Sequence, residues 1–584
     1  MQNLLWSSLV CLSVMGVSPA WAQSQSAPMS GAPSGSPASP VPPQQGGGMT
    51  PSQPGQVTPQ SAANTIRTYS TVVVLDGVAL DAKGNPVLDL KADDFKITED
   101  DAPQTIRRFE VPGRTMPPAN VDIESTADLD RLAPEAPVNI VLLDEFNTHF
   151  EDMAFARYSL KKWLEKQPGK LDEPTMLIAV SIDKFQVLRD YTQDKQQIIS
   201  ALDHHFAANP WQSHSFSWVP ERFSTAFITL MRVAEASSGH PGHKDMIWLG
   251  RGFPNINLQN AGVDGERQVH NAVQRTVNQL RDARVTLYTI DPAGLQIDPG
   301  SYGNFAGTFS PFGGEPNFEA LSVATGGRPI HGRNDVDAMI GTAIRDGASL
   351  YSMSYRPTNN TYDPQKFRRI KVVVDRPGVT FVTRQGYYPQ GGPARPTQDG
   401  RVGRQLATEL VSASASNMVY DAVPFVLAIA PEDVHQWMVT VMPKGLAWYF
   451  GTADQPRSTR LLVTVTTFDK KNKLLKTEGK RMEFKAPMTA PARGRYESGV
   501  RFPYKLEPDP KAVRARMVVR VEATGHMGSA DFPLTVGTTV SSDGQNPTVN
   551  ATPANTPPQT TAPPAAQPGD PAPAASPTPP PPAQ

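Results

Sequence analysis

The sequence predicts a multidomain protein in which an α/β domain lies between β-rich domains and both termini are disordered. Its 584 residues suffice for three or four domains at roughly 100–200 residues each. Its 58 prolines, roughly twice the usual share, exclude one compact core running from end to end. Residues 137–347 alternate between strand-like and helix-like patterns, whereas the segments on either side are strand-like only. That alternation is typical of a mostly parallel sheet covered by helices.

Composition excludes several functional classes. Lys and Arg number 55 and Asp and Glu number 56, so the net charge of −1 gives no electrostatic reason to expect nucleic acid as a partner. A single cysteine, Cys11, excludes a disulfide framework and a multi-cysteine zinc site. No P-loop, HExxH or GxSxG motif is present. The sequence therefore predicts no catalytic residues and no bound organic cofactor.

Residues 1–22 are predicted to be a signal peptide. An apolar run from Leu4 to Val17 is followed by Ala20-Trp21-Ala22, which fits the small-x-small rule for signal peptidase. The run is too short to anchor a protein in a bilayer. We therefore expect export to the periplasm, the cell surface or the medium, with no transmembrane segment after cleavage.

Two flanking segments are predicted to be disordered. Residues 23–60 are rich in Ser, Pro and Gly, and residues 539–584 are rich in Pro, Ala and Thr. Neither segment has enough large apolar residues to offset the entropy lost on ordering. Each is either a flexible spacer or a polyproline ligand or stalk.

The β-rich parts follow from short, β-branched runs between turn signals. Residues 61–112 form a small β unit, and residues 348–390 supply further strands. Neither segment alone has enough strands for independent stability, so we expect them to pack together with the α/β domain inserted between them. Residues 113–136 are predicted to be a linker. Residues 401–538 are predicted to form a C-terminal β-sandwich-like domain.

The α/β domain, residues 137–347, is predicted from continuous apolar runs separated by helical periodicity. Val138–Leu143, Met176–Ile182, Met246–Leu249 and Val285–Ile290 are the strand-like runs. Continuous apolar strands are expected where both faces of a sheet are buried. Ligands of such sheets bind beyond the carboxyl ends of the strands.

The segment Ile140–Thr148, Ile-Val-Leu-Leu-Asp-Glu-Phe-Asn-Thr, resembles the first strand and metal-site loop of a von Willebrand factor A domain. Lys244–Pro254, Tyr288–Leu295 and Ala324–Gly327 follow in an order similar to that of bacterial, acidobacterial-type VWFA-related exported proteins. The resemblance implies a Rossmann-like α/β fold and a role in protein–protein interaction.

The resemblance also implies a metal-ion-dependent adhesion site, built from Asp-x-Ser-x-Ser, a Thr and a second Asp. Asp144, Thr148 and Thr225 match positions of that site, but Phe146 and Arg251 stand where oxygen ligands are expected. Mg²⁺ prefers six oxygens, so we expect a degenerate site with weak Mg²⁺ binding or none. Without metal, Asp144 is expected to cap the following helix or to pair with Arg251.

Three other segments are weaker candidates. His240-Pro241-Gly242-His243 is predicted to be a surface turn rather than a metal site. The acidic stretch Asp93–Asp101 is predicted to be a solvated turn, with calcium binding as the alternative. The Gly-rich stretch Pro299–Pro316 is either a flexible loop or the lip of a binding site.

These features predict an exported, non-catalytic binding, adhesion or scaffold protein that contacts an unknown protein in the cell envelope or outside the cell. One alternative is an exported hydrolase with a site assembled from Asp144, Asp291 and a histidine. The other is a purely structural envelope protein.

Overall fold

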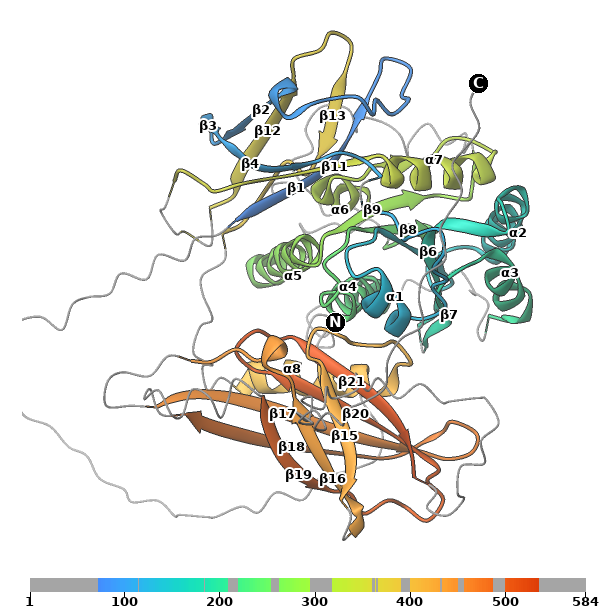
Figure 1. The fold of residues 1–584 in the computed structure, drawn as a ribbon. Coiled ribbons are helices and arrows are strands. Elements are labelled where there is room, and N and C mark those ends of the chain that lie inside the picture. Colours follow the sequence, from blue (N-terminus) through green and yellow to red (C-terminus); the bar gives the residue numbers. More distant parts are fainter. Residues whose placement is uncertain are drawn as a thin grey trace, which may run out of the picture.

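The computed structural model describes residues 72–113, 115–182, 184–207, 219–253, 262–294, 318–359, 363, 366–389, 400–430, 433–449, 456–486 and 499–534. The predicted signal peptide, both predicted disordered segments and the Pro299–Pro316 loop lie outside these residues. The described chain is a mixed α/β structure with several sheets and more strand than helix. Figure 1 shows three parts, which we call the β unit, the α/β unit and the C-terminal unit.

The β unit combines two segments that are far apart in sequence. Its two four-stranded sheets have the orders β13-β1-β11-β4 and β14-β12-β2-β3, so each sheet takes strands from both 61–112 and 348–390. Phe95 and Ile97 share one core with Tyr351 and Met353. The strands are β1 (Val73–Leu80), β2 (Phe95–Glu99), β3 (Ala102–Gln104), β4 (Ile106–Glu110), β11 (Leu350–Tyr355), β12 (Arg368–Val374), β13 (Thr380–Thr383) and β14 (Gly386–Tyr387).

The α/β unit is built on one six-stranded sheet of order β10-β9-β8-β5-β6-β7. All its pairings are parallel except that of β7, which runs antiparallel to β6 at one edge. The strands are β5 (Val138–Asp144), β6 (Lys170–Val180), β7 (Phe185–Asp194), β8 (Lys244–Leu249), β9 (Val285–Ile290) and β10 (Pro329–Ile330).

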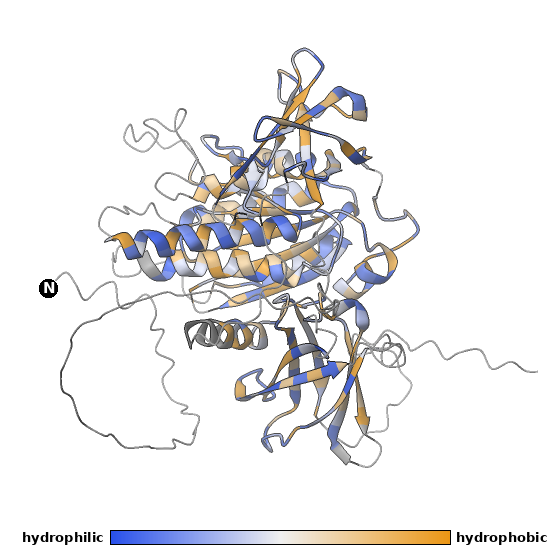
Figure 2. Ribbon diagram, turned by 90° about the vertical axis from the view of Figure 1, so that its left-hand side faces the viewer, coloured by the Kyte–Doolittle hydropathy of each residue, from blue (hydrophilic) through white to orange (hydrophobic). Residues whose placement is uncertain are grey.

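Helices cover both faces of this sheet, as the apolar strands require. Ile140 and Leu142 of β5 belong to the core beneath α4, α5 and α6, whereas Val141 and Leu143 belong to the core beneath α2, α3 and α7. In Figure 2 the long helices nearest the viewer carry both hydrophilic and hydrophobic residues. The helices of this unit are α1 (Thr126–Leu132), α2 (Phe150–Lys166), α3 (Lys195–His204), α4 (Val219–Ala236), α5 (Gly262–Asp282), α6 (Phe318–Thr325) and α7 (Val336–Ala348).

The C-terminal unit consists of two antiparallel sheets that share one core. Their orders are β15-β16-β19 and β18-β17-β20-β21, and Val439 of the first sheet lies in the same core as Val463 of the second. The elements are α8 (Gly400–Ala415), β15 (Phe425–Ala430), β16 (Asp433–Val441), β17 (Arg457–Phe468), β18 (Leu474–Ala486), β19 (Val500–Lys505), β20 (Arg514–Val521) and β21 (Met527–Pro533).

The sequence predictions missed two helices. The predicted linker 113–136 contains α1, which begins at the N-cap Ser125 and buries Leu129 in the core of the α/β unit. The region 401–538, predicted as β-sandwich-like, also contains α8, whose Leu410 and Ala413 pack into that same core. Helix α1 has only 7 residues, and α8, with 16, contains few large apolar side chains, so the helical period is weak in both.

Among the described residues, no helix combines the length and the apolar character that a membrane span requires.

Candidate functional site

The candidate site lies at the carboxyl edge of the six-stranded sheet. From β5 the chain passes to β6 on one side and later to β8 on the other, so the strand order reverses between β5 and β8. Ligands of open α/β sheets bind in the crevice at such a switch point. We call residues 144–152, 250–253 and 291–294, which follow β5, β8 and β9, the crown.

Asp144 is the most deeply buried acidic group of the crown, with none of its surface exposed. One of its oxygens, Oδ1, accepts a hydrogen bond from the backbone N–H of Asn147 at 2.9 Å. The other, Oδ2, accepts from the indole Nε1 of Trp248 at 3.0 Å and from the backbone N–H of Gly252 at 2.7 Å. Burial raises the pKa of Asp144 to about 7, although these hydrogen bonds favour the ionised form.

Two glycines allow the β8 loop to approach Asp144 so closely. Gly250 has a φ of +143°, and a Cβ there would lie 2.5 Å from Asp144 Cβ and 2.4 Å from Thr148 Oγ1. Gly252 has a φ of +69°, and a Cβ there would lie 2.1 Å from the ring of Phe318. Only glycine tolerates both this backbone conformation and this proximity. The loop can therefore direct its backbone N–H groups at the carboxylate.

The predicted metal ligands are only partly brought together. Thr148 is buried beside Asp144, and its Oγ1 accepts a hydrogen bond from the backbone N–H of Arg251 at 3.2 Å. Thr225 is half-buried in α4 and makes no hydrogen bond with either residue in the described chain. Both Asp144 oxygens face N–H donors, which repel a cation. Within the described ranges, no cluster of three or more His, Asp or Glu side chains is placed to hold a metal ion. The donor set therefore does not fit Mg²⁺.

The prediction that Asp144 caps the following helix or pairs with Arg251 is wrong. Helix α2 has His149 at its N-cap position, and Asp144 instead closes the loop before it through Asn147. Arg251 reaches past Asp144 to the rim, where its guanidinium lies 3.5 Å from Asp152 and 3.6 Å from Asp291. The reason is that Asp144 is already satisfied by N–H groups that only the folded loop supplies.

A buried pair missed by the sequence analysis supports the crown from below. Glu145 Oε1 lies 2.7 Å from Nε2 of His205, and both side chains are almost fully buried. His205 directly follows α3, so the pair fixes the end of that helix to the first crown loop. Glu145 next to Asp144 was the available signal, but its partner is sixty residues further along the chain.

The carboxyls suggested for a hydrolase do not form one solvent-facing pair. Asp144 is buried, whereas Asp291 lies at the rim, where its Oδ1 accepts the backbone N–H of Ala293 at 2.9 Å. A two-carboxylate mechanism needs both groups to face one substrate. Asp144 and Asp291 therefore do not form the pair of carboxylates that the hydrolase alternative requires.

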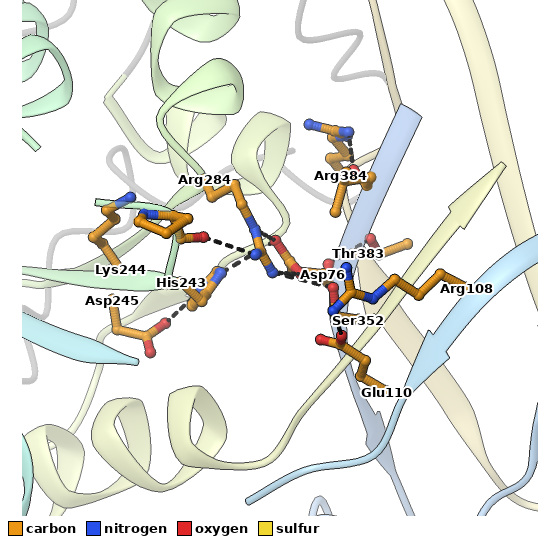
Figure 3. A network of polar contacts seen from close by, with 12 residues as sticks. Asp76, Arg108, Glu110, His243, Lys244, Asp245, Arg284, Ser352, Thr383 and Arg384 are labelled. Atoms are coloured by element: carbon orange, nitrogen blue, oxygen red, sulfur yellow. Dashed lines mark hydrogen bonds and ion pairs between the residues drawn. The ribbon is translucent and has the colours of Figure 1, made fainter. Parts of the chain in front are cut away.

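A second polar cluster lies at the opposite, amino edge of the sheet (Figure 3). Arg284, before β9, donates to both oxygens of Asp76 in β1 at 2.7 and 3.1 Å. His243, before β8, lies 3.3 Å from Asp76 and 3.1 Å from Asp245. We call these four residues the hub. It joins the β unit to the α/β unit.

Charges within the hub are strongly coupled. Burial alone would lower the pKa of His243, but the carboxylates of Asp245 and Asp76 outweigh it and raise that pKa to about 9. Burial would raise the pKa of Asp76, but Arg284 and His243 outweigh it and hold that pKa well below its usual value. Asp76, His243 and Arg284 are therefore all charged at neutral pH, whereas burial raises the pKa of Asp245.

The surface-turn prediction for His240-Pro241-Gly242-His243 is wrong in part, because Pro241 is exposed but both histidines are buried. His240 and His243 are 3% and 7% exposed. The Nε2 of His240 lies 2.7 Å from the carbonyl oxygen of Ala136. The histidines are buried because the β unit and the C-terminal unit pack beside the turn, where Asp421 accepts the backbone N–H of Gly239 at 3.0 Å and Asp76 lies 3.3 Å from His243.

The prediction of a solvated turn at Asp93–Asp101 is also wrong in part. Glu99 is buried, accepting hydrogen bonds from Arg368 at 2.9 Å, Tyr355 at 2.7 Å and Tyr387 at 3.1 Å. These three partners come from the second segment of the β unit, which is 250 or more residues away. Glu99, at the end of β2, therefore closes a buried network, whereas Asp100 and Asp101 of the turn are exposed as predicted.

No model of a known protein family matches this chain, and no curated protein matches it.

Proposed function

We propose that this chain is an exported, non-catalytic binding protein whose α/β unit is a von Willebrand factor A-like domain and contacts a protein partner through the crown. The observation that carries the proposal is the switch point between β5 and β8, where Asp144, Thr148 and Arg251 converge in a sheet with one antiparallel edge strand. A rigid crown suits recognition, because a preformed surface loses little entropy on binding.

The placement of the two flanking units supports the same surface. The β unit is joined through the hub at the amino edge of the sheet. The C-terminal unit contacts α4 and β7, through a hydrogen bond from the Met527 backbone N–H to Glu235 at 2.9 Å and reciprocal bonds between Asn417 and Val187. Neither set of contacts involves the crown.

Site-specific photo-crosslinking tests the proposal. Benzoylphenylalanine is placed at the exposed Glu151 of the crown, and in a matched variant at the exposed Lys371 of β12. Each purified chain is irradiated with envelope extract or culture medium of the source organism. We expect one discrete protein adduct from position 151 and none from position 371. Adducts from neither position, or equally from both, would refute the crown as the binding surface.

A purely structural role is the second candidate, because the core of the α/β unit continues into the C-terminal unit. Tyr420 and Met527 pack in the same core as Leu230 and Val233 of α4. A scaffold of this kind predicts retention in the envelope with no crown-specific adduct, so the same experiment separates the two roles.

A further inference from the structure

The guanidinium of Arg251 lies at the rim of the crown, the surface proposed above to contact a partner. Its Cα lies between Gly250 and Gly252, both with positive φ, and its backbone N–H is bonded to Thr148. Gly250 itself donates to the carbonyl oxygen of Ile290 at 2.9 Å. The backbone is thus fixed on both sides, and the side chain, 28% exposed, extends to the rim at the switch point.

The hydrogen-bonding capacity of this guanidinium is mostly unused. Arginine has five N–H donors, and the hydrogen bond to Asp152 is 3.5 Å long. Its Nε is buried without a hydrogen-bond partner, and the nearest Asp291 oxygen lies 3.6 Å away. Charge-assisted hydrogen bonds normally shorten to about 2.7–2.9 Å. Asp152 and Asp291 therefore orient the cation without satisfying it.

We propose that Arg251 binds a carboxylate of the partner protein directly, as a two-pronged ion pair that needs no metal. This inference rests on the proposed function and adds the chemistry of the partner, an exposed Asp or Glu side chain. A guanidinium presents two parallel N–H groups that match the two oxygens of a carboxylate.

Asp152 lies beside the guanidinium that the partner's carboxylate would bind. An incoming carboxylate must compete with Asp152 for the guanidinium. Asp152→Asn removes that competitor, so it should strengthen binding by about two- to fivefold, the range for a half-exposed ion pair. A purely structural Arg251–Asp152 pair predicts no gain.

The probe is N-acetyl-aspartyl-glycinamide, with the asparaginyl analogue and inorganic sulfate as comparison ligands, in ligand-observed NMR titrations of the full chain. A single contact of this kind gives a Kd on the order of 1 mM. We expect the aspartyl peptide to bind equally well in EDTA and in Mg²⁺, and the asparaginyl analogue not to bind. Arg251→Gln should weaken binding about tenfold or more, and Arg251→Lys should weaken it less.

Arg376→Gln is the matched control, because it removes the same charge from an exposed pair with Asp89 in the β unit. It should leave the Kd unchanged. Equal binding by Arg251→Gln, a requirement for Mg²⁺, tighter binding of sulfate than of the aspartyl peptide, or no gain in Asp152→Asn would each overturn the proposal. If Arg251→Gln still gives the adduct from position 151, the proposed function stands and only this inference fails. If position 151 gives no adduct in the wild-type chain, the proposed function fails first.

Discussion

Substitution of Asp76 by Asn is predicted to loosen the β unit from the α/β unit. The change keeps the shape of the side chain but removes the negative charge that faces Arg284 at 2.7 and 3.1 Å and His243 at 3.3 Å. Two cations are then left close together. Removing one partner of a buried ion pair typically costs about 3–5 kcal/mol.

The lower end of that range applies here. Asp76 is 10% exposed, but Arg284 keeps 27% of its side chain exposed and can recover some hydration. We therefore expect the free energy of opening at the hub to fall by about 3 kcal/mol. At 1.36 kcal/mol per factor of ten, amide hydrogens near the hub should exchange on the order of a hundredfold faster.

Hydrogen exchange followed by mass spectrometry measures this directly, and a chain with several packed units need not unfold in one step. Peptides covering β1 and β9 report on the hub, and peptides covering β17 in the C-terminal unit serve as the internal reference. Asp375→Asn is the matched control, because its ion pair with Lys96 is 68% exposed on both sides. That change should leave the exchange rates of all these peptides nearly unchanged, because exposed ion pairs contribute little to stability.

The effect should also depend on pH. The folded pKa of His243, about 9, lies above its unfolded value of about 6.5. Its stabilisation is therefore complete below about pH 6.5 and is lost as the pH rises through about 9. The gap between the wild type and Asp76→Asn should narrow above about pH 9 without closing, because Arg284 stays charged. A gap below tenfold in exchange rate at pH 7 would contradict this account of the hub.

Three further outcomes are expected. The melting temperature should barely change with EDTA or millimolar Mg²⁺ in thermal scans, because no described cluster fits a metal; a clear rise with Mg²⁺ would refute this. Gly252→Ala should lower the free energy of unfolding by more than about 1 kcal/mol in urea titrations, because φ at this position is +69° and the added Cβ would overlap the ring of Phe318. Gly84→Ala is the control and should cost less, because no atom lies near the added Cβ. The mature protein should begin at Gln23 when its N-terminus is analysed by mass spectrometry, because Ala20-Trp21-Ala22 fits signal peptidase; an intact Met1 would refute export by this route.

The strands of the α/β unit were predictable because each is a continuous run of mostly apolar residues, which indicates burial on both faces. Val138–Leu143 is apolar at every position but Asn139, and alternate residues enter the two cores on opposite faces of the sheet. Val285–Ile290 coincides with β9. The pairing of segments 61–112 and 348–390 was also accessible, because each segment has too few strands to be stable alone.

The polar sites were much less predictable, since their partners come from distant parts of the chain. His243 and Glu99 stand among turn-forming and charged residues, which locally indicate exposure. His243 is buried beside Asp76, and Glu99 is buried beside Tyr355 and Arg368, and these partners come from distant segments. Asp144 was placed correctly at the carboxyl edge of its strand, but its N–H donors depend on the positive φ values of Gly250 and Gly252.

The hub and the crown lie at opposite ends of the same strands, and this separates stability from recognition. Strand β8 begins at Lys244, next to His243 of the hub, and ends two residues before Arg251 of the crown, with all six of its residues buried. Packed strands of this kind deform little, so loosening the hub should not move the crown loops. Asp76→Asn should therefore leave the affinity of the crown for the aspartyl peptide unchanged while it speeds exchange in β1. If both changed together, the sheet would be transmitting strain between its edges, and the flanking β unit would have to be counted as part of the binding machinery.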